Sequence, residues 1–207
     1  MMETLEHDDS VRTLGGPAGF EEEIKKSRFL AFAVRVADPE AALEKVAEIA
    51  RSDATHNCWA YRIGDEYRFS DDGEPGGSAG RPILAAIDGH GLDQVLVVVT
   101  RYFGGTKLGV GGLVRAYGGT ASKCLDKANL LVLTPRCLAT VEIPFSDISS
   151  VHNILPDFRV LKKDEGYTES GVVLSLELEE SCWDSFRQEL RNTTRGSARF
   201  IKVEEIK

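Results

Sequence analysis

Glycine is concentrated in two stretches between residues 70 and 119, and these stretches constrain the fold more than any other feature of the sequence. The first reads S-D-D-G-E-P-G-G-S-A-G-R-P (residues 70–82), and the second reads V-V-V-T-R-Y-F-G-G-T-K-L-G-V-G-G-L-V-R-A-Y-G-G (residues 97–119). Because glycine weakens helices and strands, it is favoured where the backbone turns sharply or approaches another group closely. Both stretches lead into apolar runs, which predicts two loops that build one surface.

The composition of the 207-residue chain is that of a soluble globular protein, with 42% hydrophobic and 28% charged residues. No apolar run reaches the ~20 residues that a membrane helix needs. The acidic first ten residues lack the features of a secretory signal, so we expect a cytoplasmic protein. The four cysteines are widely spaced and form no C-x-x-C pair, which favours free thiols over disulfides or a metal site.

The charge of the chain is unevenly distributed. The net charge is −8, which argues against a general nucleic-acid coat protein. Between residues 100 and 127, five basic residues against one acid leave a local charge of about +4, and therefore about −12 elsewhere. A positive patch on an acidic protein can select an anionic partner, although a solvated helix face would have the same composition. The five basic residues are Arg101, Lys107, Arg115, Lys123 and Lys127.

The hydrophobic periodicity predicts an α+β fold in two domains, with the first at residues 1–134 and its core at about 20–129. Gly118 and Gly119 lie inside a predicted helix, where each costs roughly 1 kcal/mol relative to alanine. We attribute that cost to close packing of another backbone. In this domain we expect strands at 11–14, 20–25, 28–36, 54–63, 67–69 and 93–102, and helices at 38–51, 82–88 and 110–128.

The composition changes at N-L-L-V-L-T-P (residues 129–135), which we interpret as a linker to a second domain at 135–207. The elements of that domain follow the order βαββαβ, which is the ferredoxin-like pattern. Ser146 is the expected N-cap of its first helix. We expect strands at 138–145, 158–163, 172–178 and 200–206, and helices at 147–155 and 182–192.

The second glycine-rich loop lies between a predicted strand and the start of a predicted helix, where free N–H groups and the helix dipole favour an anion. It does not match the phosphate-binding G-x-x-x-x-G-K-[ST]. It does not match a dinucleotide fingerprint either, because Val114 stands where the third glycine is due. Anion binding and tight packing of a glycine-lined turn therefore both stay open.

Polar residues around the first loop also allow two interpretations. Asp71, Asp72 and Glu74 are candidates for a Mg²⁺ site or an acid–base cluster, but a turn held by Asx hydrogen bonds and paired with an arginine fits better. His56 and Cys58 share one strand face, where a buried pair is favoured over a zinc site or a nucleophile.

Aromatic residues alternate with arginines in the predicted strands ahead of each glycine-rich loop. Tyr102 and Phe103 follow Arg101 directly, and tyrosines and arginines also alternate at residues 61–69. Such a mixture can stack single-stranded bases. It can equally form a half-buried sheet face, so this pattern alone does not decide between the two.

Three motifs resemble the IMPACT/YigZ family, an uncharacterised group also called UPF0029. They are A-T-H-N-C-W-A-Y at 54–61, S-D-D-G-E-P-G-G-S-A-G-R-P-I-L at 70–84 and V-V-V-T-R-Y-F-G-G-T-K-L-G-V-G-G-L-V-R-A-Y at 97–117. The resemblance implies an N-terminal α/β domain similar to the fourth domain of elongation factor G, and a C-terminal domain similar to the fifth. Eukaryotic relatives resemble translational regulators that bind a ribosome-associated activator of a starvation kinase. The resemblance implies no reaction, cofactor or catalytic residue.

These observations support a leading hypothesis and two rivals. We expect a non-catalytic cytoplasmic regulator without a cofactor, which binds RNA, the ribosome or a translation-associated protein through a basic glycine-rich face. The first rival is a phosphate- or nucleotide-binding enzyme that uses Asp71, Asp72 and Glu74. The second is a protein-binding module built on the C-terminal domain. The predicted contact residues are Arg81, Arg101, Tyr102, Gly104, Gly105, Lys107, Gly109, Gly111, Gly112 and Arg115.

Overall fold

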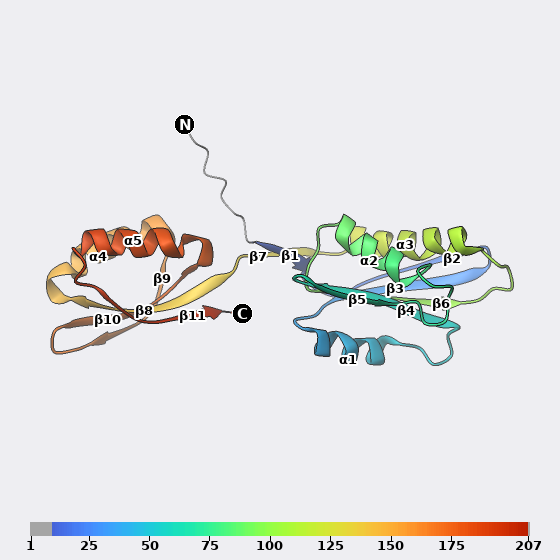
Figure 1. Cartoon of the computed structure of the whole chain (residues 1–207), viewed down its shortest axis with the longest axis horizontal. Coiled ribbons are helices and arrows are strands. Elements are labelled where there is room, and N and C mark those ends of the chain that lie inside the picture. The colour runs from blue at the N-terminus through green and yellow to red at the C-terminus, as the bar shows by residue number, and fades with distance from the viewer. Residues whose placement is uncertain (1–9, 207) are drawn as a thin grey trace, which may run out of the picture. The chain divides into compact units, whose positions relative to one another are not determined.

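The computed structural model describes residues 10–206, apart from the side chains of residues 202, 205 and 206. Residues 1–9, which the sequence assigns to the first domain, lie outside the described residues. The described chain separates into two compact units, residues 11–132 and residues 133–206 (Figure 1). No helix in the described part is long and apolar enough to cross a membrane.

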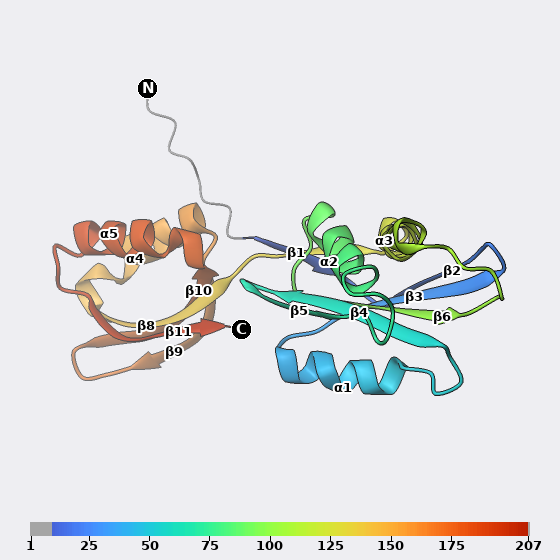
Figure 2. The ribbon, with the colours of Figure 1, turned by 45° about the vertical axis from the view of Figure 1, so that its right-hand side comes forward.

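The N-terminal unit is built on a five-stranded antiparallel sheet with the strand order β2-β3-β6-β4-β5. Helices α2 and α3 cover one face and α1 lies on the other (Figure 2). The central strand β6 is buried on both faces, as its continuous apolar run predicts. The elements are β2 (Ala18–Ile24), β3 (Ser27–Arg35), α1 (Pro39–Ile49), β4 (His56–Ile63), β5 (Glu66–Ser70), α2 (Gly80–Gly89), β6 (Val95–Tyr102) and α3 (Val110–Asp126).

The two central glycines of α3 differ in their surroundings. A Cβ added to Gly118 would lie 3.4 Å from the Cβ and the carbonyl oxygen of Pro82 in α2, so close packing explains this glycine. A Cβ added to Gly119 would meet nothing within 4 Å outside its own helix. The expectation of close packing therefore holds at Gly118 and is wrong at Gly119.

A short two-stranded sheet joins the beginning and the end of this unit. Strand β1 (Val11–Leu14) pairs with β7 (Leu130–Leu133), and the N–H of Gly15 donates to the carbonyl oxygen of Asn129 over 2.8 Å. The segment that the sequence marks as a linker thus contains a strand. Its partner is more than a hundred residues away, and a four-residue apolar run carries no periodicity that identifies a strand.

The C-terminal unit has the predicted βαββαβ order. Its antiparallel sheet has the strand order β11-β8-β10-β9, and α4 and α5 cover one face (Figure 1). This order places the first and third strands of the motif at the centre, which is the ferredoxin-like arrangement. The elements are β8 (Arg136–Pro144), α4 (Ile148–Ile154), β9 (Leu161–Tyr167), β10 (Gly171–Glu179), α5 (Trp183–Thr193) and β11 (Arg199–Ile206).

Two details of this unit differ from the prediction. Residues Phe145–Asp147 form a 3₁₀ turn before α4, and no side chain caps that helix, so the expected Ser146 cap is wrong. A second 3₁₀ turn, Leu155–Phe158, follows α4 and ends at Arg159, which has a left-handed backbone with φ 50°. Strand β9 therefore begins three residues later than expected.

Candidate functional site

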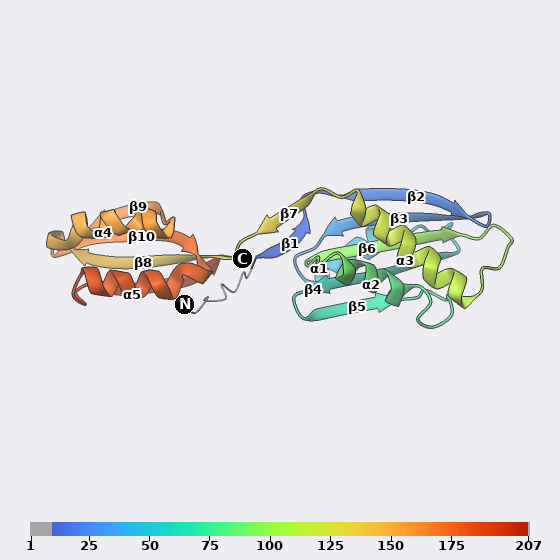
Figure 3. The ribbon, with the colours of Figure 1, turned by 90° about the horizontal axis from the view of Figure 1, so that it is seen from above.

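Both glycine-rich loops lie at one end of the five-stranded sheet, together with the turn between β2 and β3 (right-hand side of Figure 3). The strand register brings these segments together, because β2 and β5 end where β3 and β4 begin, and β6 ends beside them. We call this region the loop end and define it as residues 25–27, 71–80 and 103–112. The strand register therefore explains how two loops so far apart in the sequence come to share one end of the domain.

A buried carboxylate connects the first loop to the sheet and to α3. Glu74 is 9% exposed, and its Oε1 accepts hydrogen bonds from Nη1 of Arg101 on β6 (2.6 Å) and from the hydroxyl of Tyr117 on α3 (2.7 Å). Burial raises the pKa of Tyr117, so its hydroxyl keeps its proton and acts as a donor. Of the two interpretations of the acidic turn, pairing with an arginine is the one seen in the structure.

Arg101 is not a surface residue, which corrects its predicted role as a partner contact. It is 5% exposed, and its guanidinium lies 5.5 Å from the ring centre of Phe29 and 5.4 Å from that of Phe103. Its Nε atom is buried without a hydrogen-bond partner among the described residues. Strand alternation is the reason, because Arg101 shares the α3-covered face of β6 with Val97 and Val99.

Asp71 closes the first loop through backbone hydrogen bonds. Its carboxylate accepts the N–H groups of Gly77 (2.7 Å), Ala79 (2.9 Å) and Gly80 (2.8 Å), and so caps the start of α2. Burial alone would raise the pKa of Asp71, but these three hydrogen bonds outweigh it and hold the pKa below its ordinary value. This carboxylate therefore serves the loop rather than a ligand.

Asp72 and the neighbouring β4 residues also form hydrogen bonds with backbone groups. Asp72 Oδ2 accepts the N–H of Asn57 (2.6 Å), and His56 Nδ1 lies 2.7 Å from the carbonyl oxygen of Asp72. Cys58 Sγ donates to the carbonyl oxygen of Asp71 (3.0 Å), so His56 and Cys58 bind the loop rather than each other. Within the described residues, no group of three His, Cys, Asp or Glu side chains could hold a metal ion.

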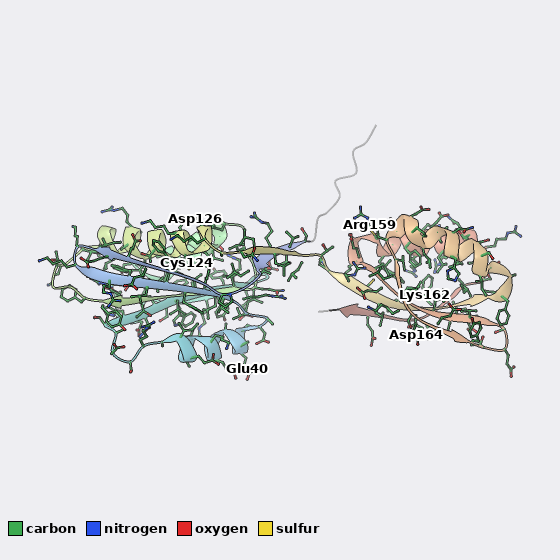
Figure 4. All side chains as sticks on the ribbon, turned by 180° about the vertical axis from the view of Figure 1, so that it is seen from behind. Glu40, Cys124, Asp126, Arg159, Lys162 and Asp164 are labelled. Carbon is green, nitrogen blue, oxygen red and sulfur yellow. The ribbon has the colours of Figure 1, made fainter. Side chains whose placement is uncertain are left out.

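The two buried thiols of this domain are poor nucleophiles. Burial raises the pKa of Cys58 to about 12 and that of Cys124 to about 11. Figure 4 shows Cys124 between α3 and the sheet, where no reagent reaches it without local opening. Because the thiolate is the reactive form, the raised pKa values keep Cys58 and Cys124 in their unreactive protonated form at neutral pH.

The second loop packs directly on the turn between β2 and β3. A Cβ added to Gly104 would overlap the carbonyl oxygen of Lys26, and the N–H of Gly104 donates to Ser27 Oγ (3.2 Å). Only glycine allows this approach. The contact brings Lys25 and Lys26 to the loop end. The sequence prediction missed both lysines, although a K-K pair between two predicted strands was a usable signal for a basic turn.

Five exposed cations gather at or beside the loop end, and none of them forms an ion pair with another described residue. By contrast, Arg28 and Lys123 are paired with Glu21 and Glu22. The positive surface thus includes residues from three separate segments of the chain and is not limited to the basic sequence window. The five cations are Lys25, Lys26, Arg81, Lys107 and Arg115.

The backbone before α3 is shaped by left-handed glycines. Gly105 and Gly109 have φ angles of 85° and 73°, and Gly109 precedes the first residue of the helix. No side chain caps α3, so the backbone N–H groups of its first turn lack a side-chain capping oxygen. Gly111 and Gly112 lie within this first turn of α3. The second glycine-rich loop therefore lies at a helix start, as expected, and anion binding there stays a prediction.

Tyr102, the last residue of β6, and Phe103, which follows it, have different roles. Tyr102 is half-buried, and its hydroxyl donates to Asp53 Oδ1 (3.0 Å), so it is held on the α1 side of the sheet. Phe103 is 47% exposed and presents its ring at the loop end. Lys123 and Lys127 lie over the ring of Phe20, far along α3 from its start, and do not belong to the loop end.

Comparison with known proteins identifies both units. The Impact N-terminal domain matches residues 25–125, which include the whole loop end, and a domain of unknown function (DUF1949) matches residues 141–197. The chain is 50% identical over 155 residues to an IMPACT family member in the pol 5′ region of Thermus thermophilus, a match that covers 75% of this chain and 86% of the relative. The chain belongs to the IMPACT family.

Other IMPACT proteins align over nearly the whole chain. YigZ of Escherichia coli is 34% identical over 198 residues, which covers 91% of this chain and 96% of YigZ. YvyE of Bacillus subtilis is 34% identical over 180 residues, with 84% and 82% covered. A crystal structure of a hypothetical protein has a TM-score of 0.65 at 33% identity and covers 94% of this chain and 98% of its own. These matches confirm the family resemblance and the mixed α/β two-domain fold.

Proposed function

We propose that this IMPACT protein is a non-catalytic regulator that binds single-stranded RNA through the loop end of its N-terminal domain. The IMPACT family is known as a regulatory family. The observation that carries the proposal is the group of five exposed cations at or beside the loop end, which also presents the exposed ring of Phe103. Grooves that bind single strands combine these two features, because cations contact the phosphates and aromatic rings stack on the bases.

Phe103 is suited to stacking because the buried guanidinium of Arg101 contacts its ring. The guanidinium of Arg101 lies 5.4 Å from the ring centre and is itself held by Glu74. A cation over one face of a ring is attracted by its π electrons, and this contact keeps the ring in place. The 47% exposed ring can then receive a base without a large loss of side-chain freedom.

The phosphate contacts come from the exposed cations and from α3. Lys107 and Arg115 flank the start of α3, and Lys25 and Lys26 lie across the Gly104 contact. The uncapped N-terminus of the helix adds backbone donors and the positive end of its dipole. Each of these groups recognises phosphate without reading a base, so we expect affinity with little sequence preference.

The enzyme alternative finds less support in the geometry. Asp71 and Asp72 accept backbone hydrogen bonds, and Glu74 is paired with Arg101. Carboxylates held in this way are poorly placed to bind a metal ion or to move a proton. A thermal-shift screen with nucleotides and Mg²⁺ tests this alternative, because selective stabilisation by one nucleotide would favour an enzyme over an RNA-binding regulator.

Fluorescence anisotropy with a labelled oligouridine tests the proposal. We expect Lys107→Ala with Arg115→Ala to raise the Kd about tenfold or more, and to lower the slope of log Kd against log salt by about 1.4. The control variant, Arg35→Ala with Lys45→Ala, removes the same charge from sites outside the loop end. A flat salt dependence, or equal losses in the two double variants, would refute the proposed surface.

Phe103→Ala separates base stacking from simple charge attraction. We expect about a tenfold loss of affinity for oligouridine, because stacking contributes roughly 1–3 kcal/mol per base. Binding to heparin, a polyanion without bases, should not change. Equal losses for both ligands would point to an acidic protein or another polyanion as the partner instead of RNA.

A further inference from the structure

A groove lies on the opposite face of the same sheet, away from α2 and α3. Helix α1 packs mainly on β4 and β6, reaches Val34 near the end of β3, and leaves β2 and the rest of β3 uncovered on its side (Figure 2). The groove between the end of α1 and these strands has a volume of about 520 Å³, within the range of small-molecule sites. Side chains that line it include Glu21, Leu30, Phe32, Ile49, Arg51 and Thr100.

The floor of the groove is apolar because of strand alternation. Phe29 and Ala31 of β3 point into the core beneath α3, so Leu30 and Phe32 point to the other face. Phe32 is 37% exposed, and Ile49 from the last turn of α1 lines the groove beside it. The floor thus presents apolar surface that no element of the domain covers completely.

Gly19 makes room in this groove. It lies in the middle of β2, directly opposite Phe32 on β3, and its side-chain position belongs to the groove. Its φ is not in the left-handed region, and the nearest atom to an added Cβ, the carbonyl oxygen of Ala31, would be 3.9 Å away. Neither backbone conformation nor tight packing requires glycine here. A glycine inside a strand without such a reason is typical of a site that something approaches closely.

Arg51 supplies a positive charge at the groove from a backbone position that is held by hydrogen bonds. Asn57 accepts the N–H of Arg51 and donates to its carbonyl oxygen, each over 3.0 Å, and also accepts the hydroxyl of Thr100 over 3.0 Å. The backbone of Arg51 is therefore held, while its exposed side chain forms no ion pair with a described residue. The carboxylate of Glu21 is already bound by Arg28 over 2.7 Å, so the free charge at the groove is positive.

We propose that this groove binds a small apolar organic anion. The apolar part of the ligand lies on Leu30 and Phe32 in the space beside Gly19, and its anionic group pairs with Arg51. The proposal does not depend on RNA binding, because the groove and the loop end cations use different residues. Its failure would leave the proposed regulator function unaffected.

Anilinonaphthalene sulfonate is a suitable probe, because it joins an apolar aromatic body to one anionic group and fluoresces when bound. N-phenylnaphthylamine has the same rings without the sulfonate and serves as the matched neutral probe. We expect the full-length protein to bind the sulfonate about tenfold more tightly than the neutral probe, the difference that a charge-assisted hydrogen bond supplies. Equal affinity for both probes would overturn the role of Arg51.

Substitutions at Arg51 locate the anion. Arg51→Gln should weaken binding of the sulfonate about tenfold and change binding of the neutral probe less than about twofold. Arg51→Lys should restore part of the affinity, and Arg35→Gln, at the far end of β3, should have no effect. If the double variant Lys107→Ala with Arg115→Ala weakens binding of the sulfonate instead, the probe binds at the loop end and the proposal is wrong.

Gly19→Val tests the space itself. Valine fits a strand, so the fold should keep or gain stability, while the added side chain should abolish binding of both probes. Amide chemical shifts in the wild-type protein should change at Gly19, Arg51 and Thr100 on addition of the sulfonate. Unchanged binding by Gly19→Val, or shift changes confined to other residues, would overturn the proposal even if all variants fold.

Discussion

The cores of the two domains are built differently. The core of the C-terminal domain contains apolar side chains and one cysteine, packed between one sheet and two helices. The core of the N-terminal domain contains a similar apolar cluster, but charged and polar residues lie at its loop end. Those residues include Ser27, Glu74, Ser78 and Arg101.

The difference follows from what each core has to hold in place. The C-terminal helices follow their strands through short turns, so apolar packing positions them. In the N-terminal domain, Glu74 reaches from a long glycine-rich loop to Arg101 on β6 and Tyr117 on α3. A loop rich in glycine has few apolar side chains to pack, and a buried ion pair supplies the directional contacts that fix its position.

The largest expected effect tests that ion pair. Arg101→Met leaves the Glu74 carboxylate buried without its cation and should destabilise the N-terminal domain by about 3–5 kcal/mol. Arg136→Met breaks the partly exposed pair with Glu177 in the C-terminal domain and should cost less than about 1 kcal/mol, because Glu177 keeps its second partner Lys163. Urea unfolding followed by Trp59 and Trp183 reads the two domains separately, since each contains one of the two tryptophans.

A double variant provides the control for this comparison. Glu74→Gln with Arg101→Met removes both charges and should recover much of the loss, because no buried charge is left uncompensated. If Arg101→Met costs no more than Arg136→Met, the ion pair does not anchor the loop, and the distinction between the two cores fails.

The next effect concerns the contact between the second loop and the β2–β3 turn. Gly104→Ala places a methyl group on the carbonyl oxygen of Lys26 and should destabilise the N-terminal domain by about 1–3 kcal/mol. Gly111→Ala is the matched control, because its methyl group would meet only the end of Arg115 at 3.8 Å. Thermal unfolding followed by Trp59 compares the two variants. Equal melting temperatures would contradict a close contact between Gly104 and the β2–β3 turn.

Acid should affect the first loop through Asp71. Its lowered pKa means that the ionised carboxylate stabilises the fold above the ordinary carboxyl pKa, and this contribution is lost as the pH falls through the lowered value. Asp71→Asn should cost about 1 kcal/mol at neutral pH and make the Trp59 urea midpoint less sensitive to acid. Glu40→Gln, on the exposed side of α1, should change neither the stability at neutral pH nor the acid sensitivity of the urea midpoint. Parallel acid profiles for wild type and Asp71→Asn would contradict this role.

The smallest effect has the opposite sign. Gly119→Ala should stabilise α3 by about 0.5–1 kcal/mol, because alanine is the better helix former and nothing outside the helix lies near the new methyl group. Gly118→Ala should gain less, since its methyl group meets Pro82 at 3.4 Å. Chemical denaturation of the two variants decides this, and a loss at Gly119 would mean that this glycine has a packing or binding role.

Most of the fold could be predicted from the sequence. The apolar alternation of the C-terminal strands and the spacing of its helices led to the correct βαββαβ order. The Asp38–Pro39 start of α1 is also as expected, with Asp38 accepting the N–H of Ala41. Strand β7 was missed because its pairing with β1 depends on a distant segment and not on a local pattern.

The candidate site was predictable only in part. Glycine content identified both loops, and charge identified Lys107 and Arg115 as exposed cations. A count of charges along the sequence cannot say which face of a strand a residue occupies, so Arg101 was placed at the surface although it faces the core. Lys25 and Lys26 were missed because the pairing of β3 with β6 and the Gly104 contact, both between distant segments, bring their turn to the second loop.

The sequence by itself determined the helices, the strands other than β7 and the positions of the glycine-rich turns, because these depend on the conformational preferences and periodicity of neighbouring residues. The tertiary structure decided which charges are exposed. Whether a cation faces solvent or a buried carboxylate depends on contacts between residues far apart in the chain, as Glu74 and Arg101 show. Such contacts exist only after the sheet has assembled and α3 has covered one of its faces.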